Sequence, residues 1–373
     1  MNIEQYNASP FKGKMKEIVM TMNSMRANEK MPIDITLREY LALNKDKYNN
    51  ATPETMYDSL GIMPAVDTIE NIFTMPTDED IRWLVPEIWR DSIRLGLRKA
   101  PIWPNIIAQQ QTVSQTTVKM PYWNMSNAIA SRVNEAETIP MGSVSYGSKE
   151  VSIYKVGKGI RVSDEVRNYV TVNIVSLFLQ DFGIKMGHSL DTLLIDVLLN
   201  GDQTNGSESA PIVGITTINT LTYRDLLRIF IRMARLGRTP NTMIAGEDMA
   251  LDVLDLTEFK TRNSGTPDKQ LNLKTPVPSS VDFFIHGNVP DDQIIMVDTS
   301  AAVIKLDARP LLVESDRIIS NQTQDTYATL TTGFANLFRD GRLLLDQSVD
   351  FDVDGFPSYL NPAAQENAPF VQP

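Results

Sequence analysis

One long apolar stripe constrains this chain more than any other feature of its sequence. Ser163, followed by two acidic residues, has the pattern of a helix N-cap, and Gly201 supplies a stop at the far end. Between them apolar residues recur at helical spacing: Val166, Val170, Ile174, Leu177, Phe178, Phe182, Met186, Leu190, Leu194, Val197 and Leu198. The pattern predicts one helix of roughly 55 Å, a structural spine. Gly183 and Gly187 mark its expected bend.

The first 75 residues predict short helices that need something to pack on. Thr36 and Glu39 match a capping box, while Thr52 and Pro53 begin another helix that Gly61 ends. Helices this short are not stable alone in water. Two alternatives therefore stay open: a small helical subdomain, or an arm laid across a neighbouring subunit.

Residues 112–157 predict a long two-stranded flap. Val118 and Met120 alternate with polar residues, as do Val151 and Ile153. Because an isolated two-stranded ribbon is marginal in water, the flap needs an external partner or a hidden sheet. We expect these flap residues to contact another subunit: Trp123, Arg132, Glu135, Glu137 and Lys149. The expected hinge residues are all glycines: Gly157, Gly159, Gly183 and Gly187.

The remaining segments alternate helix with strand. A helix is predicted from Glu87 to Arg98 with Pro86 at its first position, and Thr222 with Asp225 caps another. Strands are predicted at 242–245, 281–285, 293–297, 311–314, 328–338 and 342–345. This mixture indicates an α+β fold with a compact α/β unit at 221–306.

Residue types exclude several kinds of chemistry. The chain has no Cys and only two His, so it offers no disulfide, no Cys-type zinc site and no three-His metal site. It also lacks glycine-rich phosphate loops and the H-E-x-x-H motif. We therefore expect no catalytic residues and no cofactor. A net charge of −11 argues against a surface that grips nucleic acid. No membrane span or secretion signal is visible, which favours a soluble intracellular protein.

One acidic segment invites a metal hypothesis. Asp350, Asp352 and Asp354, followed by Gly355, match the first half of an EF-hand loop. Asn361 stands where the bidentate Glu is needed, so a solvated acidic tail is favoured over a metal site.

The order of elements is more informative than any motif. A helical arm, a helix, a long flap, the spine helix, an α/β block and returning strands follow one another. Five segments carry a resemblance: 83–89 (WLVPEIW), 157–166 (GKGIRVSDEV), 190–201 (LDTLLIDVLLNG), 309–315 (RPLLVES) and 328–345. In this order the chain resembles the major capsid protein of tailed phages, with the Hong Kong 97-type fold.

The resemblance implies both a domain division and a function. The expected parts are an N-terminal helical extension or arm (1–75), an arm with the first core helix (76–111), the extended loop (112–157), the peripheral domain with its spine helix (158–220), the axial domain (221–306), returning peripheral strands (307–349) and a C-terminal tail (350–373). The implied function is self-assembly into pentamers and hexamers of an icosahedral shell. That shell would enclose double-stranded DNA without sequence-specific binding.

The resemblance also implies partners and a location. Portal and scaffolding proteins are expected partners, with room for a decoration protein, and no membrane is involved. The protein would assemble in the bacterial host cytoplasm and reside in the virion capsid. Two alternatives stay open: an encapsulin-like nanocompartment shell around a protein cargo, and a soluble α/β enzyme that uses His188 or His286.

Overall fold

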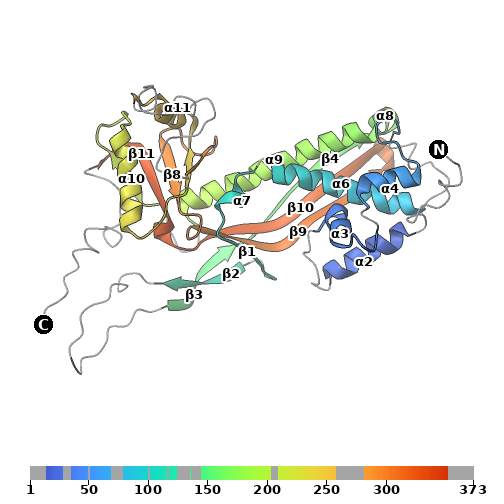
Figure 1. Ribbon diagram of the computed structural model, residues 1–373, viewed down its shortest axis with the longest axis horizontal. Coiled ribbons are helices and arrows are strands. Elements are labelled where there is room, and N and C mark those ends of the chain that lie inside the picture. Colours follow the sequence, from blue (N-terminus) through green and yellow to red (C-terminus); the bar gives the residue numbers. More distant parts are fainter. Residues whose placement is uncertain are drawn as a thin grey trace. The chain divides into compact units, whose positions relative to one another are not determined.

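The structure, a computed structural model, describes residues 14–27, 35–48, 51–68, 79–99, 101–115, 117–123, 135, 144–202, 209–257 and 281–351. Two compact units divide the chain: unit 1 comprises residues 1–101, 155–190 and 309–331, and unit 2 comprises residues 102–154, 191–308 and 332–373. Four long elements contribute to both units: β4 (Tyr154–Ser163), α9 (Val172–Asn200), β9 (Val303–Ile318) and β10 (Thr323–Asn336). The mixture of helices and strands confirms the predicted α+β class (Figure 1).

Unit 1 contains the N-terminal helices: α2 (Met15–Ala27), α3 (Leu37–Leu43), α4 (Pro53–Leu60) and α6 (Glu79–Lys99). The predicted caps of α3 and α4 are present, and Gly61 ends α4 in the left-handed conformation with φ 75°. Helices α2 and α3 both contact α6. Met15, Ile18 and Met22 are buried on α2. The described N-terminal helices therefore pack on α6 of their own chain, and an additional contact with a neighbouring subunit stays a prediction.

Helix α6 begins earlier than the sequence predicted. It starts at Glu79, so Pro86 lies inside the helix instead of at its first position. A proline inside a helix removes one backbone donor and strains the preceding turn, but neighbouring contacts can hold the helix together. The preference of proline for the first turn, which is only statistical, misplaced this boundary.

The spine is two helices and not one. A short helix α8 (Asp164–Tyr169) ends where Val170 turns to an extended conformation, and α9 then starts at Val172. The break is held from a distant segment, because the Val172 amide donates to the Asp67 carbonyl at 3.2 Å. Thr171 also forms a β-bridge with Thr68. Helix α9 has 29 residues, and it is therefore about 43 Å long.

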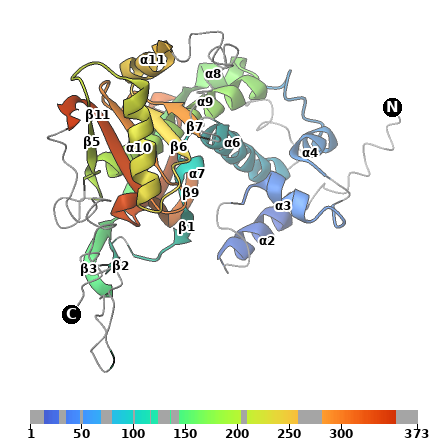
Figure 2. The same ribbon diagram turned by 60° about the vertical axis from the view of Figure 1, so that its left-hand side comes forward.

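Unit 2 is built around a five-stranded sheet with the order β5-β11-β8-β6-β7. Its strands are β5 (Ile212–Ile215), β11 (Arg342–Asp350), β8 (Gln293–Val297), β6 (Thr242–Ala245) and β7 (Asp282–Ile285). Its helices are α7 (Trp103–Ile106), α10 (Tyr223–Arg235) and α11 (Glu247–Asp255). Figure 2 shows α10 lying across the sheet. Alternate residues of the strands point to opposite faces, so each face has its own core.

The two cores of this sheet differ in the helices that cover them. On one face, Met243, Met296 and Leu343 pack with buried residues of α10 and α11. On the other face, Ile244 and Ile295 pack with Ile106 of α7 and with the C-terminal part of α9. The sheet is therefore covered on both sides within unit 2.

A second sheet has four strands in the order β1-β9-β10-β4, where β1 spans Gln109–Thr112. Strands β2 (Thr117–Trp123) and β3 (Val144–Ser152) form a separate antiparallel ribbon. Two 3-10 turns, Ile319–Asn321 and Arg339–Gly341, connect the last strands. Among the described helices, none combines the length and hydropathy that a membrane crossing requires.

Candidate functional site

The ribbon β2–β3 carries the predicted subunit contacts. Trp123 ends β2 opposite Val144, and Lys149 of β3 lies opposite Met120. Glu135 is exposed. Arg132 and Glu137 lie outside the described residues. The structure thus places two of the five residues on the ribbon and one in an exposed turn, and their contacts with another subunit remain a prediction.

Within the described residues, the ribbon pairs with no third strand. Its cross-strand ion pair, Lys119 to Glu150 at 3.8 Å, joins two half-exposed side chains, and such a pair contributes about 0–1 kcal/mol. The base of the ribbon is well packed, because Val151 and the adjacent Ile153 join a core cluster with Leu306. The ribbon therefore has a firm base and two unpaired edges, which are an opportunity for pairing with another chain.

The predicted hinge glycines make close contacts. A Cβ at Gly159 would lie 2.7 Å from the ring of Tyr327, and one at Gly157 would lie 2.7 Å from Thr329 Cγ2. Both glycines are in β4 beside β10. The contacts explain why these positions lack a side chain, while a hinge role remains a prediction.

A small polar network fixes the tip of the same strand pair. Arg161 donates two hydrogen bonds of 2.7 Å to the Asp325 carboxylate, and Tyr327 Oη donates to the same carboxylate at 3.0 Å. The hydrogen bonds from Arg161 outweigh burial and lower the pKa of Asp325. The ring of Tyr327 is thereby held over Gly159.

Helices α6 and α9 approach each other closely through glycines. A Cβ at Gly96 would lie 2.0 Å from the Gln180 carbonyl oxygen, and one at Gly183 would lie 2.1 Å from the Ile93 carbonyl oxygen. Gly187 faces Pro101 with more room, at 3.3 Å. Each helix thus offers a glycine to the backbone of the other, and no larger residue fits at Gly96 or Gly183.

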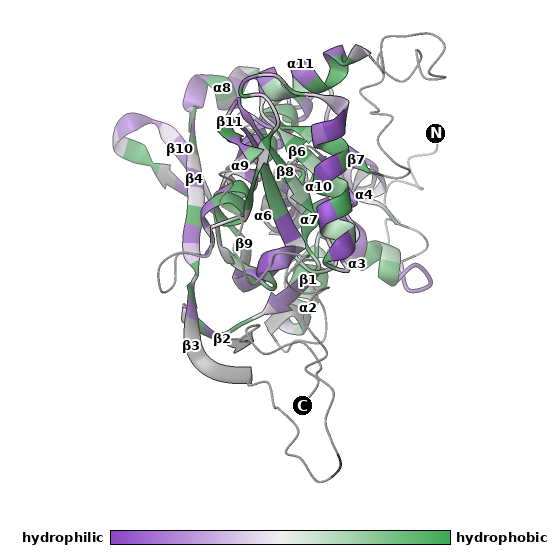
Figure 3. Cartoon of the chain, turned by 90° about the vertical axis from the view of Figure 1, so that its left-hand side faces the viewer, coloured by the Kyte–Doolittle hydropathy of each residue, from purple (hydrophilic) through white to green (hydrophobic). Residues whose placement is uncertain are grey.

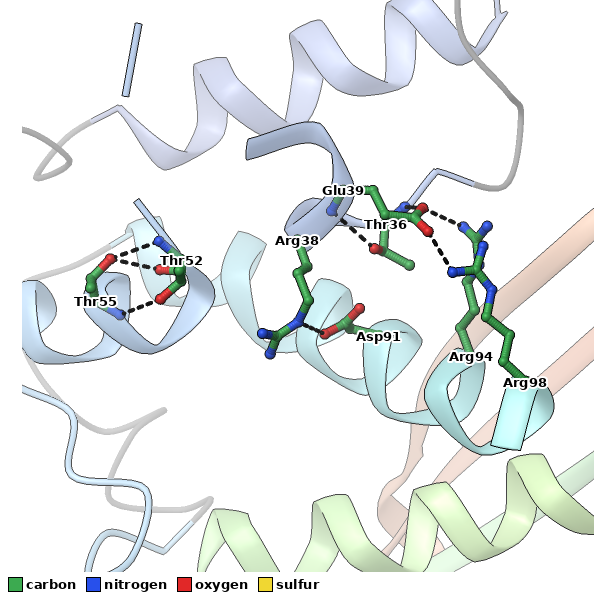
Figure 4. A network of polar contacts seen from close by, with 8 residues as sticks. All are labelled: Thr36, Arg38, Glu39, Thr52, Thr55, Asp91, Arg94 and Arg98. Atoms are coloured by element: carbon green, nitrogen blue, oxygen red, sulfur yellow. Dashed lines mark hydrogen bonds and ion pairs between the residues drawn. The ribbon is translucent and has the colours of Figure 1, made fainter. Parts of the chain in front are cut away.

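An ion-pair network attaches α3 to α6 (Figure 4). Glu39 lies 2.6 Å from Arg98 and 3.1 Å from Arg94, and Arg38 contacts Asp91 at 3.2 Å. Burial by itself raises the pKa of Glu39, but the Thr36 amide and the two arginines outweigh it and leave that pKa below its usual value. The N-terminal helices are therefore held by charge as well as by the buried face of α2.

An exposed apolar face on α8 and α9 went unrecognised in the sequence. Tyr169 is 82% exposed, and Leu177 and Phe178 are each 63% exposed, with Ile174 one turn before them. The turn that bonds to the start of α9 also exposes Met63 and Val66. We call these six residues the apolar face. Leu177 and Phe178 were assigned to the buried stripe, but the buried positions of this part of α9 are Val175, Leu179, Phe182 and Met186.

The sequence of α9 contains a pattern that indicates this exposed surface. Apolar residues occupy two sets of positions on α9, each at helical spacing: one set begins at Ile174 and the other at Val175. A helix with one covered face needs only one set. The second set therefore indicates a second contact surface.

The remaining candidate residues are the two histidines and the acidic segment that follows β11. His188 is exposed on α9, while His286 follows β7 and its Nδ1 accepts a hydrogen bond from the Asn288 amide at 3.2 Å. Asp350 is exposed at the end of β11, and Asp352 and Asp354 lie outside the described residues. The metal hypothesis for these aspartates stays untested.

The solved structures that are similar to this chain include a virus-like particle and structures from phages. A virus-like particle from Pyrococcus furiosus has a TM-score of 0.46 and 8% identity, and the match covers 69% of this chain and 96% of that one. The structure titled Mycobacterium phage Bobi has a TM-score of 0.47 and 14% identity, covering 66% and 90%. The capsid structure of Cyanophage P-SCSP1u has a TM-score of 0.47 and 14% identity, covering 67% and 88%.

Curated proteins gave no match to this sequence. A family model described as phage capsid protein matches residues 146–345, which is more than half of the 373-residue chain. The matched segment contains α8, α9, the five-stranded sheet and the returning strands. The chain belongs to the phage capsid protein family.

Proposed function

We propose that this capsid protein assembles into pentamers and hexamers of an icosahedral shell that encloses the double-stranded DNA of a tailed phage. Family membership makes the chain a structural, non-enzymatic shell protein of the virion capsid. The pentamers, the hexamers and the DNA are the parts that we propose. We also propose portal and scaffolding proteins as partners, and assembly in the bacterial host cytoplasm. A chain without Cys has no disulfide that the reducing cytoplasm could break.

The observation that carries the proposal is the apolar face. Leu177 and Phe178 are each 63% exposed on adjacent positions of α9, and Tyr169 is 82% exposed on α8; large apolar side chains exposed in this way favour an interaction site. In a shell protein, the occupant that is always present is a second copy of the same chain. We assign this face to such a copy.

The energy available from this contact is useful but not large. Burying the exposed 63% of Leu177 and of Phe178 yields roughly 2–4 kcal/mol for the two together, taking about 1.5–3 kcal/mol for full burial of each. Contacts of this size hold a particle only when each subunit makes several of them, as in closed rings of a shell.

The charge of the chain agrees with an enclosed polyanion. With a net charge of −11, the shell wall as a whole repels phosphate. DNA can then fill the interior without adhering to it. This supports enclosure without sequence-specific binding.

The test is assembly of a Leu177→Asp variant. The new charge must be desolvated in the contact, so we expect the concentration needed for assembly to rise by about tenfold or more, as a loss of about 1.4 kcal/mol implies. The matched control is Ser189→Asp, which adds the same charge at an exposed position of the same helix. Sedimentation velocity and electron microscopy report the particles, and nuclease-protected DNA reports the contents.

Three results would count against the proposal. If the two variants assemble at the same concentration, the apolar face is not part of the contact between copies. Particles without five-fold and six-fold clusters would contradict the architecture. Particles from infected cells that protect protein cargo and no double-stranded DNA would contradict the proposed contents.

A further inference from the structure

Helix α10 has two unlike faces. One face is buried in the core of unit 2 through Leu226, Ile229, Phe230 and Met233. The other carries four arginines at helical spacing, which we call the arginine stripe: Arg224, Arg228, Arg232 and Arg235. Ile231, 58% exposed, lies on the same side of the helix. Figure 3 shows the hydrophilic turns of α10 in purple between apolar ones. A face that is both cationic and apolar suits a partner that is both acidic and apolar.

The chain itself places such a residue on the stripe. Phe351 directly follows β11, and its ring centre lies 3.8 Å from the guanidinium carbon of Arg228 and 5.1 Å from that of Arg232. Arg228 is held in place for this contact, because it donates to the buried Asp225 at 3.0 Å and to Thr216 at 3.1 Å. Guanidinium groups bind the faces of aromatic rings in this range. The start of the C-terminal tail is therefore anchored on the stripe.

The residues after this anchor repeat its chemistry. From Asp350 to Leu360 the sequence reads DFDVDGFPSYL, so carboxylates at 350, 352 and 354 are interleaved with aromatic residues at 351, 356 and 359. Carboxylates pair with guanidinium groups, and aromatic rings stack on them. The stripe offers four arginines along α10, of which Phe351 covers two.

We propose that residues 352–360 of the same chain continue along α10 and bind the arginine stripe through their carboxylates and aromatic rings. This gives the DxDxDG segment a role as an arginine ligand in place of the metal-binding hypothesis. The proposal does not depend on the pentamers, the hexamers or the DNA.

Chain length permits this path. Ser358 lies seven positions after Phe351, and these seven steps of the chain can span at most about 25 Å. The distance along α10 from Arg228 to Ala234 is about 9 Å, at 1.5 Å per residue. The tail can therefore reach the C-terminal half of the helix without stretching.

Disulfide trapping in the full chain tests the proposal, because the natural sequence contains no cysteine to compete. The test variant carries Ala234→Cys on α10 with Ser358→Cys in the tail. One control pairs Ser358→Cys with Leu251→Cys, an exposed position on α11. A second control adds Asp352→Asn and Asp354→Asn to the test pair, which removes the charges and keeps the chain length. Non-reducing electrophoresis and mass spectrometry identify the bond.

We expect the α10 pair to close as an intramolecular disulfide about tenfold faster than the α11 pair, because a bound tail raises the effective concentration of its thiol. The Asn substitutions should reduce this advantage by about threefold or more, and 0.5 M salt should act in the same direction because it screens charge.

Equal closure at α10 and α11 would overturn the proposal. A disulfide between two chains would also overturn the proposal, because it would show that the tail of another copy occupies the stripe. If the Asn substitutions leave the closure rate unchanged, the carboxylates of the tail do not recognise the stripe. That result would also overturn the proposal and would leave the stripe as a site for another polyanion. Circular dichroism of the reduced variants checks folding, and Ile231→Cys, at another exposed position of α10, replaces Ala234→Cys if that variant is unfolded.

Discussion

Replacing Glu39 with Gln removes one charge from the contact between α3 and α6. The wild-type carboxylate lies 3.1 Å from Arg94 and 2.6 Å from Arg98. It also accepts a hydrogen bond of 3.1 Å from the Thr36 amide, which the Gln carbonyl can still accept. The substitution therefore tests the ion pairs and spares the helix cap.

The two arginines should contribute unequally. The side chain of Arg94 is only 8% exposed, so removing the Glu39 charge from beside this mostly buried guanidinium costs about 1–3 kcal/mol, the desolvation penalty that the ion pair offsets. Arg98 is more than half exposed and contributes about 0–1 kcal/mol because water screens it. The free energy of opening α3 from α6 should fall by about 2 kcal/mol, which is about a 30-fold change in the opening equilibrium.

Amide hydrogen exchange of α3 measures this opening directly, because exchange from a locally opened state follows its free energy. We expect α3 amides in Glu39→Gln to exchange about 30-fold faster at neutral pH. Amides of β6 and β8 in unit 2 should not change. Glu17→Gln is the control, since Glu17 is an exposed acid on α2. If both variants exchange at the same rate, the ion pairs do not hold the helices together.

The difference should also depend on pH with a definite sign. The pKa of Glu39 is below its ordinary value of 4.5 in the folded chain. The stabilisation is therefore fully present above that ordinary value and is lost as the pH falls through the lowered pKa. Wild type and Glu39→Gln should converge in acid and differ most at neutral pH. A gap that widened in acid would contradict the assignment.

Two further predictions concern packing and a buried ion pair. Gly183→Ala should lower the free energy of unfolding by about 1–3 kcal/mol, because its new Cβ would lie 2.1 Å from the Ile93 carbonyl oxygen and overpacking is destabilising. Gly287→Ala is the control, since a Cβ there meets nothing within 4 Å. Equal melting temperatures of the two variants would refute the close crossing of α6 and α9. Asp340→Asn should cost about 3 kcal/mol in urea unfolding, because the buried Asp340 accepts hydrogen bonds of 3.0 and 2.9 Å from Arg238. Asp248→Asn, at an exposed position, should be nearly neutral, and a similar effect of both would contradict this account.

Local signals in the sequence predicted local structure well. The capping boxes at Thr36 and Thr222 depend on residues three positions apart, and both are present. Gly201 ends α9 with φ 85°, as its place after the stripe indicated. The strands around 118 and 151 pair antiparallel. In each case the interacting residues are close in sequence or belong to a simple alternation.

Features that depend on distant segments could not be predicted in the same way. The break between α8 and α9 is held by Asp67 and Thr68, about a hundred residues before it, and the β-branched residues Val170, Thr171 and Val172 are a weak local signal that cannot name these distant partners. The sequence marks Gly183 as a bend but gives no sign of its close contact with Ile93 on another helix, and its hinge role stays a prediction. Of the candidate site, the sequence indicated the ribbon, but it could not show which apolar residues of α9 stay uncovered.

The uncovered apolar face follows from the way that α6 and α9 meet. Gly96 and Gly183 bring the two backbones so close that α6 is fixed against one side of α9. The residues buried on α9, such as Val175 and Phe182, use that side and its neighbours. A helix held at backbone contact cannot also shift around to cover Leu177 and Phe178, because any rotation of α9 would drive side chains into the space that only glycine fits. The described part of unit 1 therefore leaves this apolar surface exposed, which is the reason that we propose a second copy as its cover.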